Sequence, residues 1–143
     1  MSHYTKVKTK IKNLDTLERA LGRLGLHLHE GGKARGWQGR LQRADAIIPF
    51  MNYDVGFTKD ADGNYEMGAD WDMIPEDMGF RQAIGNVEGK RPIQGRDEVE
   101  KFRNMVNQAY SEAVIRDVAF EQGLMEDECH IEEDGTIVLE YLE

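Results

Sequence analysis

The chain has 143 residues, of which 40% are hydrophobic and 31% are charged. This composition is enough for one packed core and excludes a disordered chain, so we expect a single domain over residues 1–143. No stretch approaches the roughly 18 apolar residues that cross a bilayer, and the basic start lacks a following apolar segment, so we expect neither a membrane protein nor a secreted one. The single cysteine, Cys129, excludes an intramolecular disulfide and a cysteine-rich zinc site.

The net charge of −9 is divided unevenly along the chain. Residues 1–43 contain ten Lys and Arg against three acids, whereas residues 44–143 contain eight Lys and Arg against 24 acids. Because opposite charges pair well across neighbouring strands, we interpret the basic part as a strand that lies beside acidic strands of the same sheet. A basic binding patch is the alternative interpretation.

Two elements are expected in the first 25 residues. Residues 4–12 alternate with period two, which predicts a strand with one face of lysines. The spacing of Asp15 and Glu18 is that of a capping box, and leucines at helical spacing follow until Gly25, a typical helix stop. The predicted lysine face consists of Lys6, Lys8, Lys10 and Lys12.

The central part of the chain predicts short strands. Residues 26–29 alternate again and predict a strand, and the four glycines within residues 31–39 predict a flexible loop anchored by Trp37. Asp62 and Gly63 are typical of a hairpin turn, because both residue types tolerate a positive φ. The strands expected around them cover residues 44–50, 53–57 and 65–69.

The last third of the chain predicts a loop, a helix and a hairpin. Residues 74–96 lose the periodicity and are rich in Gly and Pro, which predicts a long loop without a core of its own. A second capping-box spacing at residues 97–100 begins the longest predicted helix, which should end at Gly123. Asp134 and Gly135 predict the turn of a terminal hairpin.

Together these elements predict an α+β domain with the order βαββββαββ. We expect an antiparallel sheet of about six to seven strands with two helices packed on one face. The opposite face is expected to be polar and open. On that face the lysines of residues 4–12 would point to solvent or toward acids of the terminal hairpin.

Four stretches carry a family resemblance: MSHYTKVKTKIKNLDTLERALGRLG, ADAIIPFMNYDVGF, VEKFRNMVNQAYSEAVIRDVAFEQG and EEDGTIVLEY. They resemble the family known as hypothetical chloroplast reading frame thirty-five, with relatives in plastids, cyanobacteria, other bacteria and cyanophages. The segments Ser2 to Thr5 and Asn107 to Tyr110 are the more specific parts of the resemblance. It implies no catalytic residues, and it implies a location in the cytoplasm, in the plastid stroma, or in a host cytoplasm if a phage encodes the chain.

A metal-binding protein, or an enzyme that uses His27 and His29, is one alternative hypothesis for the function. His27 and His29 are two residues apart, so in a strand both imidazoles project from one face and can chelate Zn, Ni or Cu if a third ligand converges on them. Such pairs are also common on strands without metal, and we predict no bound cofactor. The chain lacks a Gly-x-Ser-x-Gly nucleophile and a phosphate-binding glycine loop, so we favour a non-enzymatic role.

A protein-interaction module is the main hypothesis, with an unidentified protein partner and no membrane contact. Its motivation is the absence of a convergent catalytic set, together with aromatic and Met residues in expected loops. The predicted protein-binding residues are Trp37, Trp71, Met78 and Phe80.

Nucleic-acid binding is the alternative. The loop at residues 31–39 combines cations, an aromatic ring and glycines, which are ingredients of a contact with single-stranded nucleic acid. Because the net charge of the chain repels phosphate, such a patch would have to act locally. The predicted nucleic-acid-binding residues are Lys6, Lys8, Lys10, Lys12, Lys33 and Arg35.

Overall fold

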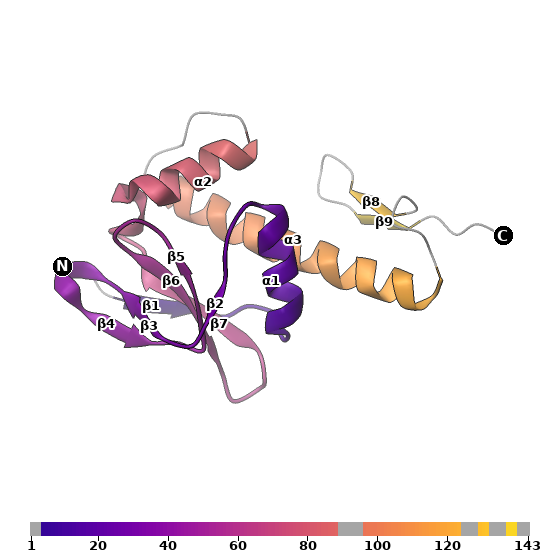
Figure 1. Cartoon of the computed structure of the whole chain (residues 1–143), viewed down its shortest axis with the longest axis horizontal. Helices are drawn as coiled ribbons and strands as arrows, with labels where there is room; N and C mark the ends of the chain where they lie inside the picture. The colour runs from indigo at the N-terminus through magenta and orange to yellow at the C-terminus, as the bar shows by residue number, and fades with distance from the viewer. Residues whose placement is uncertain (1–3, 89–95, 124–128, 132–136, 140–143) are drawn as a thin grey trace.

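A computed structural model describes residues 4–88, 96–123, 129–131 and 137–139 of the chain (Figure 1). The predicted α+β class is confirmed. The main element is a five-stranded sheet that is antiparallel throughout. Its strands, in spatial order, are β1 (Tyr4–Val7), β7 (Tyr65–Asp70), β6 (Asp54–Lys59), β5 (Ala46–Pro49) and β2 (His29–Glu30).

Three helices pack on one face of this sheet, and they are α1 (Leu14–Arg23), α2 (Met78–Glu88) and α3 (Arg96–Glu121). Figure 1 shows α3 passing behind α2, running beside α1 and continuing past the edge of the sheet. The core lies between the sheet and these helices. At its centre Phe50, Phe80 and Phe102 meet edge to face or tilted, with ring centroids 5.1 to 5.9 Å apart.

The opposite face of the sheet is covered, which corrects the expectation of an open face. The strands β3 (Lys33–Arg35) and β4 (Leu41–Arg43) form a second, two-stranded sheet that packs over β6. The short 3-10 helix η1 (Trp37–Gly39) joins them, so residues 31–39 are not the flexible loop that their glycines predicted. Gly56 lies below this layer, where Ala34 and Ala44 approach it closely.

The cap of α1 lies two residues before the predicted one. The side chain of Asn13, not Asp15, accepts hydrogen bonds from the amides of Asp15 and Thr16, at 2.9 and 3.1 Å. The predicted stop is confirmed, because Gly25 has a φ of +77°. The first strand is shorter than predicted: β1 ends at Val7, and residues 8–13 leave the sheet toward α1.

The prediction of a long loop over residues 74–96 is wrong for residues 74–88, while residues 89–95 lie outside the described residues. A 3-10 turn, η2 (Ile74–Glu76), leads into α2, and Ile74, Phe80 and Ile84 are buried. Asp77 supplies the helix cap, because its carboxylate accepts hydrogen bonds from the amides of Gly79 and Phe80. Phe80 and Ile84 are four residues apart, so both lie on the face of α2 that packs on the core.

The other predicted elements are confirmed with smaller differences. The turn between β6 and β7 contains Gly63 with a φ of +88°, and α3 is followed by Gly123 with a φ of +82°. A terminal hairpin pairs β8 (Cys129–Ile131) with β9 (Ile137–Leu139), while its predicted turn at Asp134 and Gly135 lies outside the described residues. This hairpin is a separate sheet that contacts α3, so the strand beside the lysines of β1 is β7.

Candidate functional site

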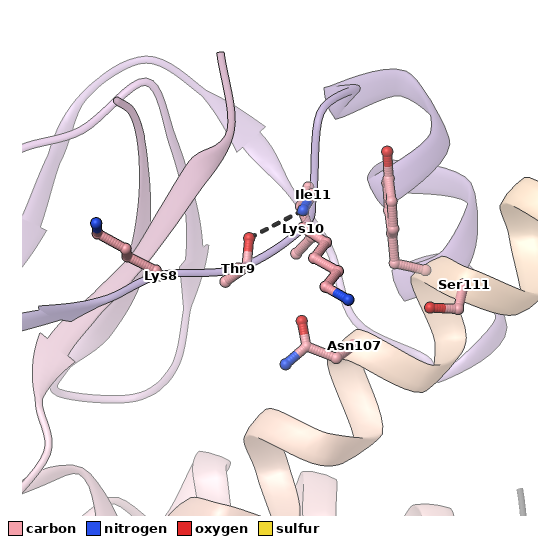
Figure 2. A pocket seen from close by; sticks show the side chains of 7 residues that line it. Lys8, Thr9, Lys10, Ile11, Asn107 and Ser111 are labelled. Carbon is pink, nitrogen blue, oxygen red and sulfur yellow. Dashed lines mark hydrogen bonds between the residues drawn. The ribbon is translucent and has the colours of Figure 1, made fainter. Parts of the chain in front are cut away.

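A groove of about 500 Å³ lies between the segment after β1 and the middle of α3 (Figure 2). One wall is the extended chain of residues 8–11, and the other is the face of α3 that carries residues 107–111. Asn107 and Ser111 are four residues apart, so both lie on the same side of the helix. The lining residues are Lys8, Thr9, Lys10, Ile11, Asn107, Tyr110 and Ser111.

Hydrogen bonds to the start of β7 hold the wall formed by residues 8–11 in place. The hydroxyl of Thr9 donates to the carbonyl of Tyr65 and accepts from the amide of Ile11, at 3.0 Å. The amide of Tyr65 in turn donates to the carbonyl of Ile11, at 2.7 Å. The side chain of Ile11 is also buried in the core, so the segment of residues 8–11 is held by packing as well as by hydrogen bonds.

Tyr110 connects the two walls of the groove. Its hydroxyl accepts hydrogen bonds from the backbone amides of Lys12 and Asn13, at 3.0 and 3.2 Å. Because Asn13 is the cap of α1, this one side chain joins α3, the segment of residues 8–13 and the start of α1. The groove is therefore a rigid feature rather than a gap between loosely packed elements.

The groove is electropositive. Lys8 and Lys10 are exposed, no acidic residue lines the groove, and neither lysine forms an ion pair with any residue that the structure describes. The acids of the same part of α3 already have partners, since Glu112 pairs with Arg116 and Asp117 with Arg19. Figure 2 shows the side chain of Lys10 extended toward Asn107 and Ser111.

The predicted nucleic-acid-binding residues divide into two groups. Lys6, Lys8, Lys10 and Lys12 are all exposed and alternate along one segment, and two of them line the groove. Lys33 and Arg35 lie on β3, in the layer on the other face of the sheet. Arg35 is occupied there by a salt bridge to Asp54, with 2.8 Å between Nη2 and Oδ1.

The four residues predicted to bind protein do not form one surface. Phe80 is completely buried in the core, and only Met78, at 55%, is exposed. The indole of Trp71 donates a hydrogen bond to the carbonyl of Thr5, at 2.8 Å, and the guanidinium of Arg103 lies 4.2 Å from its ring centroid. The remaining residue, Trp37, is half-buried, and its backbone amide donates to Asp70.

The two histidines that were considered as metal ligands are both exposed. His27 and His29 border one cavity of about 360 Å³, together with Met51 and Gln82. Within the part of the chain that the structure describes, no three His, Cys, Asp or Glu side chains are grouped so that they could hold a metal ion. Metal binding by His27 and His29 stays a prediction.

The groove itself was missed by sequence reasoning, although several of its residues were noticed separately. The lysines were assigned to a strand face, and Asn107 and Tyr110 were noticed as part of the segment that carries the family resemblance. Asn107 and Ser111 share a helix face by their spacing, which is a usable signal. Nothing in the sequence indicates that residues 8–11 lie opposite that face.

Comparison with known proteins shows the family to which this chain belongs. Residues 20–139 match the family model described as "Protein of unknown function (DUF1257)", so the chain is a member of this family. The chain is also similar to the "Uncharacterized protein ycf35" of Guillardia theta and to that of Cyanophora paradoxa. Each is 27% identical over 141 residues, which covers 97% of this chain and 94% of the relative. The resemblance inferred from the sequence is thereby confirmed.

No solved structure matches the chain. Among the described residues, no helix is both long and apolar enough to cross a membrane.

Proposed function

We propose that this chain is a protein-interaction module that binds an extended, acidic segment of a partner protein in the groove between residues 8–11 and α3. The observation that supports this proposal most is the lining of the groove. It contains two exposed lysines, two neutral polar side chains of α3 and no acid. A surface of this kind attracts carboxylates and repels other cations.

One wall of the groove suits the acidic side chains of an extended peptide, and the other wall suits its backbone. Lys8 and Lys10 offer ammonium groups to acidic side chains. Asn107 offers an amide donor and acceptor, and Ser111 offers a hydroxyl, for the peptide backbone. The rigid seating of both walls by Thr9 and Tyr110 favours binding, because little conformational freedom is lost when the partner docks.

The groove supports a protein partner better than a nucleic acid. Single-stranded nucleic acids bind through exposed aromatic rings as well as cations. The one aromatic residue of the groove, Tyr110, is 8% exposed, and its hydroxyl already accepts two backbone hydrogen bonds. The net charge of −9 also opposes a phosphate backbone that extends beyond the groove.

The same lining supports a binding role rather than a catalytic one. A lysine or a serine acts as a nucleophile when a neighbouring base or a depressed pKa activates it. Neither a histidine nor a carboxylate lines the groove beside Lys10 or Ser111. We place the interaction in the cytoplasm or in the plastid stroma, a proposal that the similarity to the ycf35 proteins of Guillardia theta and Cyanophora paradoxa supports.

The experiment is a binding titration with a labelled peptide that alternates Glu with small apolar residues, followed by fluorescence anisotropy at low and moderate salt. The test variant is Lys8→Glu with Lys10→Glu. The matched control is Lys33→Glu with Lys59→Glu, which changes the charge equally at exposed positions outside the groove. We expect the test variant to lose at least about tenfold in affinity and the control to lose much less.

Asn107→Ala with Ser111→Ala adds a variant without any charge change. It should also weaken the peptide, because it removes the hydrogen-bonding groups of the helical wall. Equal losses in the test and control variants would show that the attraction is not located in the groove. A single-stranded oligonucleotide that binds more tightly than the peptide would favour the nucleic-acid alternative.

A further inference from the structure

The cavity that His27 and His29 border lies at the edge of the main sheet that β2 forms. It measures about 360 Å³ and shares no lining residue with the groove between residues 8–11 and α3. Its walls come from the segment that leads into β2, from the end of β5 with the turn after it, and from the first half of α2. A ligand in this cavity is therefore independent of the partner proposed for the groove.

The two histidines lie on the same side of their segment. Burial alternates along residues 26–29, where the two leucines are buried and the two histidines are exposed, as in a strand with one face on the core. The pairing of β2 with β5 fixes His29 at the sheet edge. Residues two apart in an extended chain lie about 7 Å apart, which lets both imidazoles reach one metal ion. Neither imidazole forms a hydrogen bond or an ion pair with a residue that the structure describes.

Met51 brings a sulfur atom to the same cavity. It lies in the turn after β5 and is 62% exposed, so its thioether is accessible. A Cβ atom at Gly79 would lie 3.2 Å from Cγ of Met51, so the methionine side chain passes closely over this glycine of α2. The carboxylate of Asp77 accepts from the amides of both residues, at 3.1 Å from Met51 and 2.8 Å from Gly79. Asp77 thus fixes the backbone of Met51 and the helical turn beneath its side chain.

The donor atoms of the lining favour a soft metal ion. Besides the two imidazoles and the thioether, the amide of Gln82 is the one other side-chain donor among the described residues that line the cavity, and none of them is an acid or a cysteine. Mg²⁺ and Ca²⁺ require several oxygen ligands, and Zn²⁺ is bound by imidazole, thiolate and carboxylate groups. Thioether sulfur is a ligand that selects Cu(I), and imidazole suits copper as well.

The remainder of the lining is apolar and includes Ile48, Phe50 and Ala83. An apolar shell around a metal site restricts the access of water and lowers the local dielectric constant. Because a charge is costly to place in such surroundings, the shell favours the singly charged Cu(I) over a divalent ion.

We propose that His27, His29 and Met51 bind one Cu(I) ion in this cavity. The two imidazole nitrogens and the thioether sulfur are its three ligands. The histidine spacing by itself is equally compatible with Zn, Ni and Cu, and the thioether is what distinguishes Cu(I) among them. Since no group of three His, Cys, Asp or Glu side chains is found among the described residues, a zinc site lacks the ligands that it needs, whereas a Cu(I) site takes its third ligand from Met51.

The test is an anaerobic titration of the full chain, without a histidine tag, with Cu(I) in competition with the chelator bicinchoninate. We expect one equivalent of Cu(I) to bind, and the methyl NMR signal of Met51 to shift until that equivalent is reached. His27→Ala, His29→Ala and Met51→Leu should each lower the affinity at least about tenfold, since even the loss of a residue that supports a metal ligand has an effect of this size.

Two variants serve as matched controls. Met78→Leu changes another exposed methionine, which does not line the cavity. His130→Ala changes a histidine of β8, in a separate sheet. Both should bind Cu(I) as the unchanged chain does, and circular dichroism establishes that every variant is folded.

The proposal is overturned if Cu(I) does not bind, if folded Met51→Leu binds it as tightly as the unchanged chain, or if Met78→Leu loses as much affinity as Met51→Leu. Zn(II) that binds more tightly than Cu(I) would also overturn it. The Lys8→Glu, Lys10→Glu variant should bind Cu(I) normally, and Met51→Leu should bind the acidic peptide normally. The failure of this proposal and the failure of the proposed function are therefore distinguishable.

Discussion

Arg35 on β3 holds the buried carboxylate of Asp54 on β6 with its backbone and its side chain together. The amide of Arg35 donates to Oδ2 of Asp54 at 2.8 Å, Nε donates to the same oxygen at 3.0 Å, and Nη2 donates to Oδ1 at 2.8 Å. The guanidinium also donates to the carbonyls of Phe50 and Met51. This one residue therefore attaches the second layer to the main sheet and to the turn after β5.

Replacement of Arg35 by Ala should destabilise the fold by about 2 to 4 kcal/mol, because the carboxylate of Asp54 stays buried and loses its charged partner, keeping only the backbone amide of residue 35. Arg35→Lys keeps the positive charge but loses the planar guanidinium that donates several hydrogen bonds at once, so its loss of stability should be intermediate. Urea unfolding followed by circular dichroism measures both. Lys33→Ala on the same strand is the control and should change the free energy of unfolding by less than about 0.5 kcal/mol.

A larger effect of Lys33→Ala than of Arg35→Ala would contradict this account of the second layer. The double variant Arg35→Ala, Asp54→Ala should be less destabilised than the sum of its single changes, because the two side chains act on each other. The same geometry explains why Arg35 contributes little to the charged surface that its sequence context predicted.

Asp77 fixes two chain segments at once. Its carboxylate accepts from the amides of Met51, Asn52 and Tyr53 in the turn after β5, at 3.1, 2.7 and 2.9 Å, and it caps α2 through Gly79 and Phe80. Burial opposes the charged form, but these amide donors together hold the pKa of Asp77 below its ordinary value. The charged carboxylate thus stabilises the folded chain.

The sign of the pH effect follows from this lowered pKa. The contribution of Asp77 is complete above the unfolded pKa of about 4, and it is lost as the pH falls through the lower pKa of the folded state. Asp77→Asn should therefore cost about 2 to 3 kcal/mol near neutral pH, and the difference from the unchanged chain should shrink below about pH 4. Chemical unfolding at a series of pH values tests it, and a difference that does not change with pH would contradict it.

The helix cap at Asp77 is a signal that is present in the sequence but was not used to predict α2. The Gly and Pro content of residues 74–96 was given more weight than the cap at Asp77 and the spacing of Phe80 and Ile84, which are the local signals of α2. The hairpin turn at Gly63 and the helix stops at Gly25 and Gly123 were predictable, because each depends on a single local backbone conformation.

Contacts between distant parts of the chain were not predictable in the same way. The covered face of the sheet depends on the small residues at positions 34, 44, 56 and 68, whose meeting requires three strands to be placed first. The groove requires residues 8–11 to leave the sheet, although their alternation is that of a strand that continues. Tyr4 and Asp70 are direct partners on the neighbouring strands β1 and β7, although they lie far apart in the chain.

The packing of the Tyr4 ring on Gly68 gives a prediction, and a second Gly→Ala substitution is its control. Gly68→Ala places a methyl group against the Tyr4 ring, so the ring must shift, and we expect a loss of about 1 to 3 kcal/mol. Gly22→Ala, in the exposed last turns of α1, meets nothing within 4 Å and should instead stabilise the chain by about 0.5 to 1 kcal/mol. Thermal unfolding of both variants decides it, and a neutral Gly68→Ala would show that Tyr4 is not confined as described.

Tyr110→Phe tests whether the groove owes its shape to one hydroxyl. The change leaves the ring in the core but removes the acceptor that the amides of Lys12 and Asn13 share, so two backbone donors next to the start of α1 lose their partner. We expect a loss of about 1 to 3 kcal/mol, since water can reach this partly buried site and replace some of the hydrogen bonding. Hydrogen exchange should report faster exchange at residues 12 and 13 and unchanged exchange in β6, the middle strand of the sheet. If the groove is held in shape by this hydroxyl, affinity for the acidic peptide should fall in Tyr110→Phe even though every lysine is retained. Unchanged affinity together with faster exchange would mean that Thr9 and the start of β7 position the lysine wall without help from α3.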